Sequence, residues 1–311
     1  MENVSNQQMR IRGNGKLLIT GEYFVLDGAM ALAVPTRLGQ QLVIEKSTVA
    51  KLHWRSLNHE NQVWFSATFS LKDFSFQKAT DTAIAERLQQ VLLAIRQQNS
   101  TFLISDQGFS VRTELEFPRL WGLGTSSTLI YALAKWAQID PYQLLADTFG
   151  GSGYDIACAG TDVPIFYQKI DGQSHSKVVH FDPPFKEHLY FVYLEKKQNS
   201  RTGIQRYREK MKEDGCTIQA ISDLTRAVAD ANNIEQFSER LLLHEQIVSQ
   251  ILDLPRAQDL YFSDFAGIIK SLGAWGGDFV LAISERQEQE VRDYFYKKGY
   301  PTIVSYADML L

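Results

Sequence analysis

The sequence is poor in the residues that several common classes of protein require. It has two cysteines among 311 residues, Cys158 and Cys216, which excludes a disulfide framework and a cysteine-based zinc site. No apolar run reaches the ~18 residues of a membrane-spanning helix. Residues 1–9 are polar and lack the apolar segment of a signal peptide, so we expect a cytoplasmic protein.

An excess of positive charge is also missing. Lysine and arginine number 32 against 36 acidic residues, and the net charge of -4 argues against a nucleic-acid partner. The six histidines are scattered. His244-Glu245 begins like a zinc-protease motif, but Val248 stands where the second ligand belongs, so His244 is predicted to be an ordinary helix residue.

What is present is the composition of a globular protein, with 44% hydrophobic residues. Alternating and β-branched segments predict strands at 10–20, 31–34, 41–45, 53–69, 109–117, 189–194, 279–283 and 302–305. Helical periodicity predicts helices at 81–98, 126–137, 140–150 and 285–297, and four more between 201 and 272. Asp140-Pro141, an N-cap residue followed by proline at the first helical position, is the predicted start of the third helix. The polar stretch 171–184 predicts a boundary between domains 1–170 and 171–311, and the whole pattern predicts an α+β fold.

A glycine-rich loop leads into the helix predicted at 126–137. It reads Gly122-Leu123-Gly124-Thr125-Ser126-Ser127. The glycines let backbone N–H groups turn toward one point, and the helix adds its own unpaired N–H groups and the positive end of its dipole. The loop is not a Walker A motif, because no Gly-Lys-Ser/Thr ends it. A phosphate-binding loop and a plain glycine turn with serine caps are the two interpretations.

A single carboxylate follows in the segment Ser152-Gly153-Tyr154-Asp155. Asp155 either orients a substrate hydroxyl and accepts its proton, or, like Ser152, closes the start of a short helix. Lys16 favours the first interpretation, since a charge within an apolar strand needs an anionic partner such as Asp155 or a phosphate. A lysine at the strand edge with its charge in solvent is the alternative.

Taken in order, these segments resemble the GHMP kinase superfamily of galactokinases, homoserine kinases, mevalonate kinases and phosphomevalonate kinases. The resemblance rests on residues 13–35, 118–160 and 271–282. Gly153-Tyr154-Asp155 and the later Gly276-Gly277-Asp278 are most similar to mevalonate and phosphomevalonate kinases. The resemblance implies a two-domain fold: an ATP-binding N-terminal domain like domain 2 of ribosomal protein S5, and a ferredoxin-like C-terminal domain.

The resemblance also implies roles for individual residues. Asp155 would be the catalytic carboxylate with Lys16 beside it, and Ser127 would be a ligand of Mg²⁺. The residues around the ATP phosphates would be Gly122, Leu123, Gly124, Thr125, Ser126 and Ser127. The residues of the substrate site would be Glu22, Tyr23, Ser152, Gly153, Gly273, Ala274 and Gly276.

Two positions depart from the pattern of the superfamily. Mevalonate kinases carry a metal-binding glutamate 11 residues before the catalytic aspartate, and Leu144 stands there in this sequence. Asp147 is close by, but the phase of the helix makes it a poor substitute. Trp275 replaces a glycine of the last loop, and we expect its bulk to narrow or block the substrate site.

We therefore expect an ATP- and Mg²⁺-dependent kinase that phosphorylates mevalonate or phosphomevalonate in isoprenoid biosynthesis. A sugar or homoserine is the alternative acceptor, and a non-catalytic ligand sensor on the same fold is the alternative function. The expected partners are ATP and a small substrate, without nucleic acid or membrane. The sequence leaves open a homodimer, the acceptor and the contacts to adenine.

Overall fold

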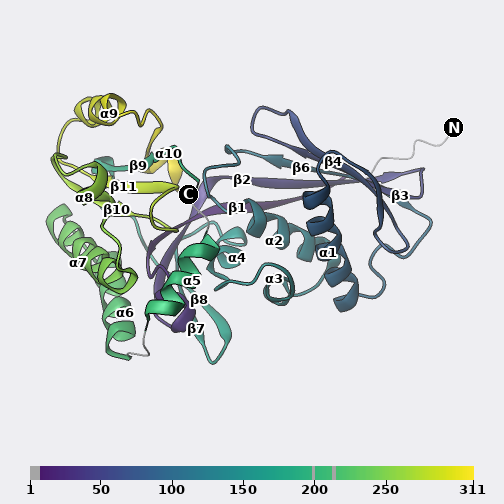
Figure 1. The fold of residues 1–311 in the computed structure, drawn as a ribbon, viewed down its shortest axis with the longest axis horizontal. Coiled ribbons are helices and arrows are strands. Elements are labelled where there is room, and N and C mark those ends of the chain that lie inside the picture. Colours follow the sequence, from purple (N-terminus) through teal and green to yellow (C-terminus); the bar gives the residue numbers. More distant parts are fainter. Residues whose placement is uncertain (1–7, 198–199, 212–214) are drawn as a thin grey trace. The chain divides into compact units, whose positions relative to one another are not determined.

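The computed structural model describes residues 8–197, 200–211 and 215–311, and its chain forms two compact units (Figure 1). The first unit contains Met1–Gly15, Leu38–Arg119 and Gly124–Gly160, and the second contains Lys16–Arg37, Leu120–Leu123 and Thr161–Leu311. Both units combine helices with β-sheet, which confirms the predicted α+β class. The boundary between residues 170 and 171 remains a prediction.

The sheet of the first unit has the strand order β5–β4–β3–β6–β2. These strands are β5 (Phe76–Ala79), β4 (Val63–Ser70), β3 (Lys51–Leu57), β6 (Gly108–Leu115) and β2 (Ala31–Ser47). β3 and β6 run parallel, and the other neighbouring pairs are antiparallel. The predicted strand region 53–69 divides into β3 and β4 at a turn, where the Asn58 side chain accepts hydrogen bonds from the backbone of Glu60 and Gln62.

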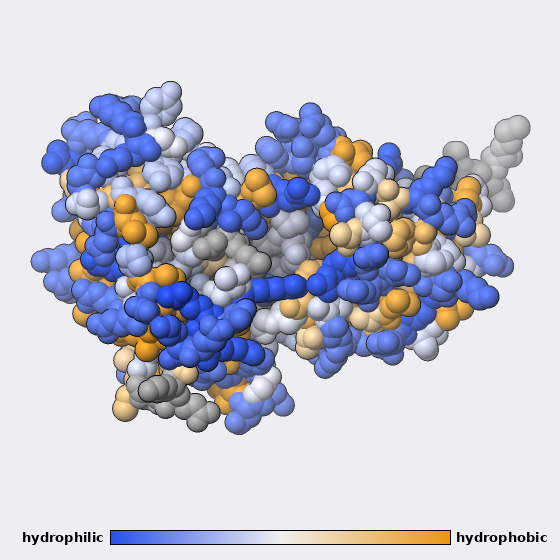
Figure 2. Space-filling view, in the orientation of Figure 1, coloured by the Kyte–Doolittle hydropathy of each residue, from blue (hydrophilic) through white to orange (hydrophobic). Residues whose placement is uncertain are grey.

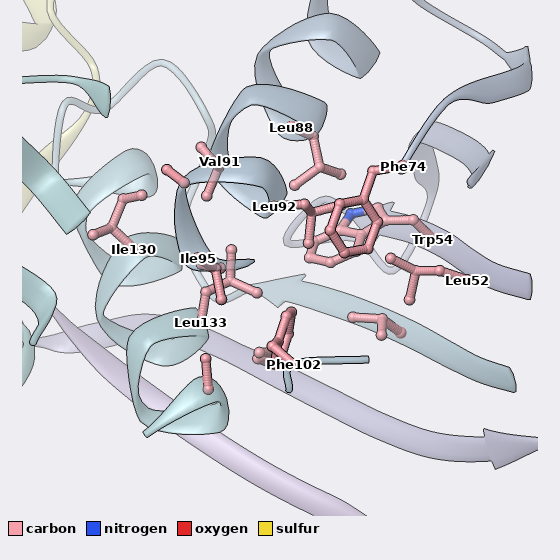
Figure 3. Close-up of a cluster of buried hydrophobic side chains, with 14 of the residues drawn as sticks. Leu52, Trp54, Phe74, Leu88, Val91, Leu92, Ile95, Phe102, Ile130 and Leu133 are labelled. Atoms are coloured by element: carbon pink, nitrogen blue, oxygen red, sulfur yellow. The ribbon is translucent and has the colours of Figure 1, made fainter. Parts of the chain in front are cut away.

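Four helices of the first unit cover one face of its sheet (Figure 1). They are α1 (Thr82–Gln98), α2 (Thr125–Ala137), α3 (Pro141–Thr148) and α4 (Tyr154–Ala159). Asp81 and Asp140 cap α1 and α3 by accepting bonds from the amides of Ile84 and Tyr142, and the cap of α3 is the one predicted. The core between the helices and the sheet is apolar and closely packed; Figure 3 labels Leu52, Trp54, Phe74, Leu88, Val91, Leu92, Ile95, Phe102, Ile130 and Leu133.

Strands β1 (Met9–Thr20) and β2 contribute residues to both units. The strand predicted at 31–34 does not end at Pro35 but continues to Ser47. Residues 31–33 pair with β7 (Ile165–Ile170), whereas residues 40–47 pair with β6. Pro35 lies between these two pairings, so its missing N–H group removes a bond from neither of them.

A β-hairpin of the second unit, formed by β7 and β8 (Gln173–Val178), was not predicted from the sequence. Its turn is Asp171-Gly172, and both residues have a positive φ, of 50° and 77°. Asp-Gly is a strong signal for such a hairpin turn. The polar stretch 171–184 therefore begins with a turn and a strand of the second unit.

The second unit also holds an antiparallel four-stranded sheet of order β10–β11–β9–β12. Its strands are β10 (Ile268–Ser271), β11 (Phe279–Ile283), β9 (Leu189–Tyr193) and β12 (Ile303–Ser305). The four helices predicted between 201 and 272 are confirmed as α5 (Ser200–Lys210), α6 (Gly215–Ala229), α7 (Ile234–Leu252) and α8 (Ala257–Tyr261). β10 was not predicted. The 3-10 turns η1 (Phe24–Asp27) and η2 (Lys186–His188) and the helices α9 (Glu288–Lys297) and α10 (Tyr306–Met309) complete the unit.

In Figure 2, apolar residues lie scattered among hydrophilic ones on the face that is shown. Exposed large apolar side chains, such as Ile104, Val178 and Tyr296, come from separate elements. Across the residues that the structure describes, no helix combines the length and the apolar character needed to cross a membrane.

Candidate active site

Helix α2 of the first unit opens on Gly124, which has a left-handed backbone with φ 99°. Gly124 has no side chain, so the N-cap residue makes no side-chain capping bond to this end of the helix. The hydroxyls of Ser127 and Thr128 instead donate to the carbonyl oxygen of Gly124, at 2.9 and 3.0 Å. The first amides of a helix have no partner within the helix, so this end can accept an anion through its N–H groups and its dipole.

Asp155 lies in the first turn of α4, and α4 packs against α2 within the first unit. The N-cap of α4 is Gly153, with φ 92° and no side chain of its own to cap the helix. Neither Ser152 nor Asp155 is therefore the N-cap residue. The Asp155 carboxylate accepts a bond from the amide of Ile156 at 3.1 Å and is half-buried. The carboxylate therefore satisfies one amide of the first turn of α4, and a catalytic role for Asp155 stays a prediction.

The two residues considered for the missing metal-binding glutamate both lie on α3. Leu144 is fully buried in the core of the first unit. Asp147 accepts hydrogen bonds from the side-chain amides of Gln98 and Gln143, at 2.9 and 2.8 Å, on an exposed surface. These positions on α3 therefore supply a core leucine and a surface aspartate that is engaged by two glutamines.

In the second unit, the backbone of β1 is joined to the start of the glycine-rich loop. The amide of Lys16 donates to the carbonyl oxygen of Leu123 at 3.0 Å. Lys16 is half-buried, whereas residues 17–20 after it are buried. Gly122 has a φ of 71°, and the carboxyl group of Asp278 lies against its Cα. The second unit therefore brings together Lys16, Gly122 and Asp278, and the last of these was not predicted as a site residue.

We expect Gly122→Ala to destabilise the protein through two separable effects. The left-handed backbone alone costs an alanine about 1–2 kcal/mol, and the new Cβ would collide with the Asp278 carboxyl group. Gly172→Ala is the matched control, because Gly172 has a similar φ of 77° with open space around it. Urea unfolding should show a larger loss for Gly122→Ala, and Asp278→Ala should recover the difference. Equal losses in the two glycine variants would contradict the collision.

The structure places Glu22 and Tyr23 inside the second unit. The Glu22 side chain is 1% exposed, and its Oε1 lies 2.5 Å from the Nζ of Lys270 on β10. Tyr23 has a φ of 64°, a strained value for a residue with a side chain. Its hydroxyl accepts a hydrogen bond from the backbone amide of Trp275 at 3.1 Å, which links it to the last glycine-rich loop.

Trp275 is 4% exposed and packs in an apolar cluster. The cluster contains Tyr23, Phe24, Ala29, Tyr207, Ile221, Val248, Leu252 and Trp275. Its indole therefore contributes to the core of the second unit.

The Glu22–Lys270 pair belongs to a larger buried cluster with the neighbouring residues His244 and Glu245 of α7. The Nζ of Lys270 lies 3.3 Å from Glu245 Oε1, and the Nε2 of His244 accepts a bond from the amide of Gly21 at 2.9 Å. Burial raises the pKa of Glu22 and Glu245, to about 7 for Glu245, although Lys270 opposes this shift. Burial, and then the charge of Lys270, hold the pKa of His244 well below its ordinary value, so this imidazole is neutral.

A raised pKa of Glu245 makes the stability of the protein depend on pH. The folded protein holds this proton up to about pH 7, whereas the unfolded chain releases it near pH 4.5. The stabilisation is therefore complete below pH 4.5 and is lost as the pH rises to about 7, with a total of about 3 kcal/mol at 1.36 kcal/mol per pKa unit. Urea unfolding between pH 5 and 8 should show this decline in wild type and a flatter profile in Glu245→Gln. Glu239→Gln, an exposed position on the same helix, should keep the wild-type profile.

Sequence reasoning did not identify this cluster, although the sequence contains a signal for it. His244 and Glu245 fall on the buried stripe of α7 together with Leu241, Val248 and Leu252. Lys270 likewise follows two isoleucines in β10. Charged side chains on apolar faces need partners of opposite charge. His244 is thus a helix residue as predicted, but it holds the backbone of the segment that carries Glu22.

Comparisons with known proteins show which solved structures share this fold. No protein-family model and no curated protein matches the sequence. Among solved structures, mevalonate kinase of L. major in complex with R-mevalonate is similar, with a TM-score of 0.70 and 14% identity over 98% of each chain. Phosphomevalonate kinase of Streptococcus pneumoniae, in complex with phosphomevalonate and AMPPNP, has a TM-score of 0.67 and 17% identity over 96% of this chain and 99% of that one.

Galactokinase of Lactococcus lactis, complexed with galactose, is similar to the same degree. Its TM-score is 0.68 with 12% identity, over 98% of this chain and 94% of that one. All three proteins are GHMP kinases, as the motifs led us to expect. The identities are low, so the likeness establishes architecture. The chain has the two-domain α+β fold of the GHMP kinases.

Proposed function

We propose that the protein is an ATP-dependent kinase of a small molecule, with mevalonate or phosphomevalonate as the acceptor. The observation that carries this proposal is the start of α2 at Gly124, a residue without a capping side chain, with Asp155 in the first turn of the adjacent helix α4. An anion site and a carboxylate are the two groups that transfer of a phosphoryl group to a hydroxyl requires. The fold supports it, since the similar structures are small-molecule kinases and one of them contains AMPPNP.

The backbone at residues 122–127 would hold the phosphates of ATP through its N–H groups. Asp155 would orient the acceptor hydroxyl and take its proton as the oxygen attacks the γ-phosphorus. Lys16 would supply positive charge near the transferred group. Because phosphoryl transfer needs little covalent help from the protein, most of the rate enhancement would come from position and charge.

Bound Mg²⁺ would neutralise part of the phosphate charge. Among the described residues, no group of three His, Cys, Asp or Glu side chains could hold a metal ion. Ser127 donates its hydroxyl hydrogen to Gly124, which leaves lone pairs of its oxygen available. Mg²⁺ usually keeps several waters and takes other ligands from phosphates, so these residues fit a metal ion that is carried by ATP.

The test is ADP release with Mg²⁺-ATP and a panel of mevalonate, phosphomevalonate, homoserine and galactose. Turnover of mevalonate or phosphomevalonate supports the proposal in full. Turnover of galactose or homoserine would support the kinase activity but assign a different acceptor. Tight binding of ATP without release of ADP for any acceptor would overturn the proposal and favour a ligand sensor, which the leucine at position 144 already suggests.

A further inference from the structure

Two segments with residues that the resemblance places in the substrate site lie far apart in the chain and close together in the second unit. One is 21–23, directly after β1, and the other is 271–277, which begins at the last residue of β10. They touch where the hydroxyl of Tyr23 accepts the bond from the amide of Trp275. Gly203 of α5 lies directly against this hydroxyl, with no space for a Cβ. The contact is therefore enclosed by a third element.

Helix α7 holds both segments through adjacent side chains. His244 accepts a bond from the amide of Gly21, in the first segment. Glu245 accepts bonds from the amide and the hydroxyl of Ser271, in the second segment, at 3.1 and 3.3 Å. One turn of one helix thus fixes the backbone of two loops.

A buried ion pair joins the same two segments directly. Glu22 belongs to the first segment, and Lys270 immediately precedes the second. The Nζ of Lys270 also donates to the carbonyl oxygen of Ser271 at 2.6 Å. All four side chains of the cluster are at most 1% exposed, so solvent does not weaken these interactions.

Two buried polar atoms indicate that the cluster does more than fill space. Within the described part of the chain, Glu22 Oε2 and His244 Nδ1 have no hydrogen-bond partner. A buried polar group without a partner is costly, and a fold keeps such groups where the surroundings determine their position. Apolar side chains would fill the same space without this cost. The cluster is therefore more than a means of packing α7 against β10.

We propose that Glu22, His244, Glu245 and Lys270 form a positioning cluster that couples segment 21–23 to segment 271–277 and so fixes the shape of the acceptor site. None of the four is a catalytic residue, since their side chains are buried. The part concerning the acceptor rests on the proposed kinase function. The coupling itself can be measured without any turnover.

The reporters are three backbone amides, those of Gly21, Ser271 and Trp275, whose acceptors are His244, Glu245 and Tyr23. We would measure hydrogen exchange of these amides by mass spectrometry in Glu245→Ala. Coupling predicts faster exchange, by about tenfold or more, at all three amides. Loss of a local contact alone predicts faster exchange at Ser271 only, and that result would overturn the proposal.

Two controls separate coupling from a general loss of stability. Val291→Ala removes apolar contacts in the other core of this unit, between α9 and the sheet, without touching the cluster. In this variant, the three amides should exchange their hydrogens no faster than the other amides of the unit. Gln246→Glu adds an exposed carboxyl next to Glu245 and should change nothing.

Glu245→Gln keeps the oxygen that accepts from Ser271 and gives a second measurement if Glu245→Ala does not fold. The groups that face Glu245 are Lys270 on β10, Glu22 after β1, His244 on α7 and Arg256 before α8. Protection of the three amides, corrected for intrinsic exchange, should fall in wild type as the pH rises from about 5 to about 7, because the closed state holds the Glu245 proton and the open state releases it. It should stay level in Glu245→Gln. Identical pH profiles would overturn the proposal.

If wild type turns over an acceptor, enzyme kinetics test the other part of the proposal, that the cluster fixes the shape of the acceptor site. Misplacement of the acceptor site should raise the KM for the acceptor in Glu245→Ala by about tenfold, and the KM for ATP should stay within about twofold. An unchanged KM for the acceptor alongside normal turnover would overturn the positioning role. If wild type shows no turnover, the kinase proposal fails, and hydrogen exchange still decides whether the cluster couples the two segments.

Discussion

Asp155→Asn should lower kcat by about two to four orders of magnitude with an acceptor whose nucleophile is a hydroxyl group, such as mevalonate. The hydroxyl must lose its proton, and an amide cannot accept it. The fold should survive, because an asparagine oxygen can still accept the bond from the amide of Ile156. Initial rates of ADP release at saturating Mg²⁺-ATP measure the effect.

The chemistry of the acceptor sets the size of this loss. The phosphate of phosphomevalonate is already largely ionised at pH 7, so it needs little help in losing a proton. The same substitution should then lower kcat far less. Comparing the two acceptors in one variant separates the role of Asp155 as a base from its role as a fixed charge.

Asp147→Asn is the matched control, since Asp147 lies on the adjacent helix α3 with its carboxylate held by two glutamines. It should retain wild-type rates with both acceptors. If Asp155→Asn turned over mevalonate at a third of the wild-type rate or faster, Asp155 would not be the base. In that case the carboxylate would have a structural role in α4.

Local signals predicted the first unit well. The periodicity of 81–98 and the Asp-Pro pair at 140–141 gave two helices whose starts lie within one residue of the observed ones. The glycine-rich loop was placed before its helix, and α2 begins at Thr125. These features depend on side chains within a few residues of each other, which a sequence displays directly.

The second unit was harder to predict because its polar contacts join distant residues. Glu22 and Lys270 are 248 positions apart, and no local pattern marks them as partners. Glu22 was expected near the substrate, whereas its carboxylate is buried against Lys270. β10 has four residues, one of them this lysine, too few to show an alternating pattern.

Lys270→Met should be the most destabilising single substitution in the buried cluster, with a loss of about 3–5 kcal/mol in the free energy of unfolding at pH 7. Methionine fills a similar volume, so the loss arises from charge and not from a cavity. Glu22, and Glu245 where it is ionised, would be left buried without a counter-ion. Urea unfolding measures the loss.

The steepness of the pH dependence identifies the cause, because wild type itself is expected to lose stability from pH 5 to 8. Burial already raises the pKa of both carboxyl groups, and the lysine opposes this rise. Without the lysine, both carboxyls should bind protons more tightly in the folded protein than in the unfolded chain. Lys270→Met should therefore regain stability as the pH falls from 8 to 5, and Glu22→Gln in the same variant should restore part of it at pH 7.

Lys298→Met is the matched control, because Lys298 pairs with Asp264 at 2.8 Å in an exposed position of the same unit. Solvent screens such a pair, so its loss should change stability little. If Lys270→Met were as stable as Lys298→Met at pH 8, the buried carboxyls would both be neutral in wild type. The cluster would then hold its two segments by hydrogen bonds alone.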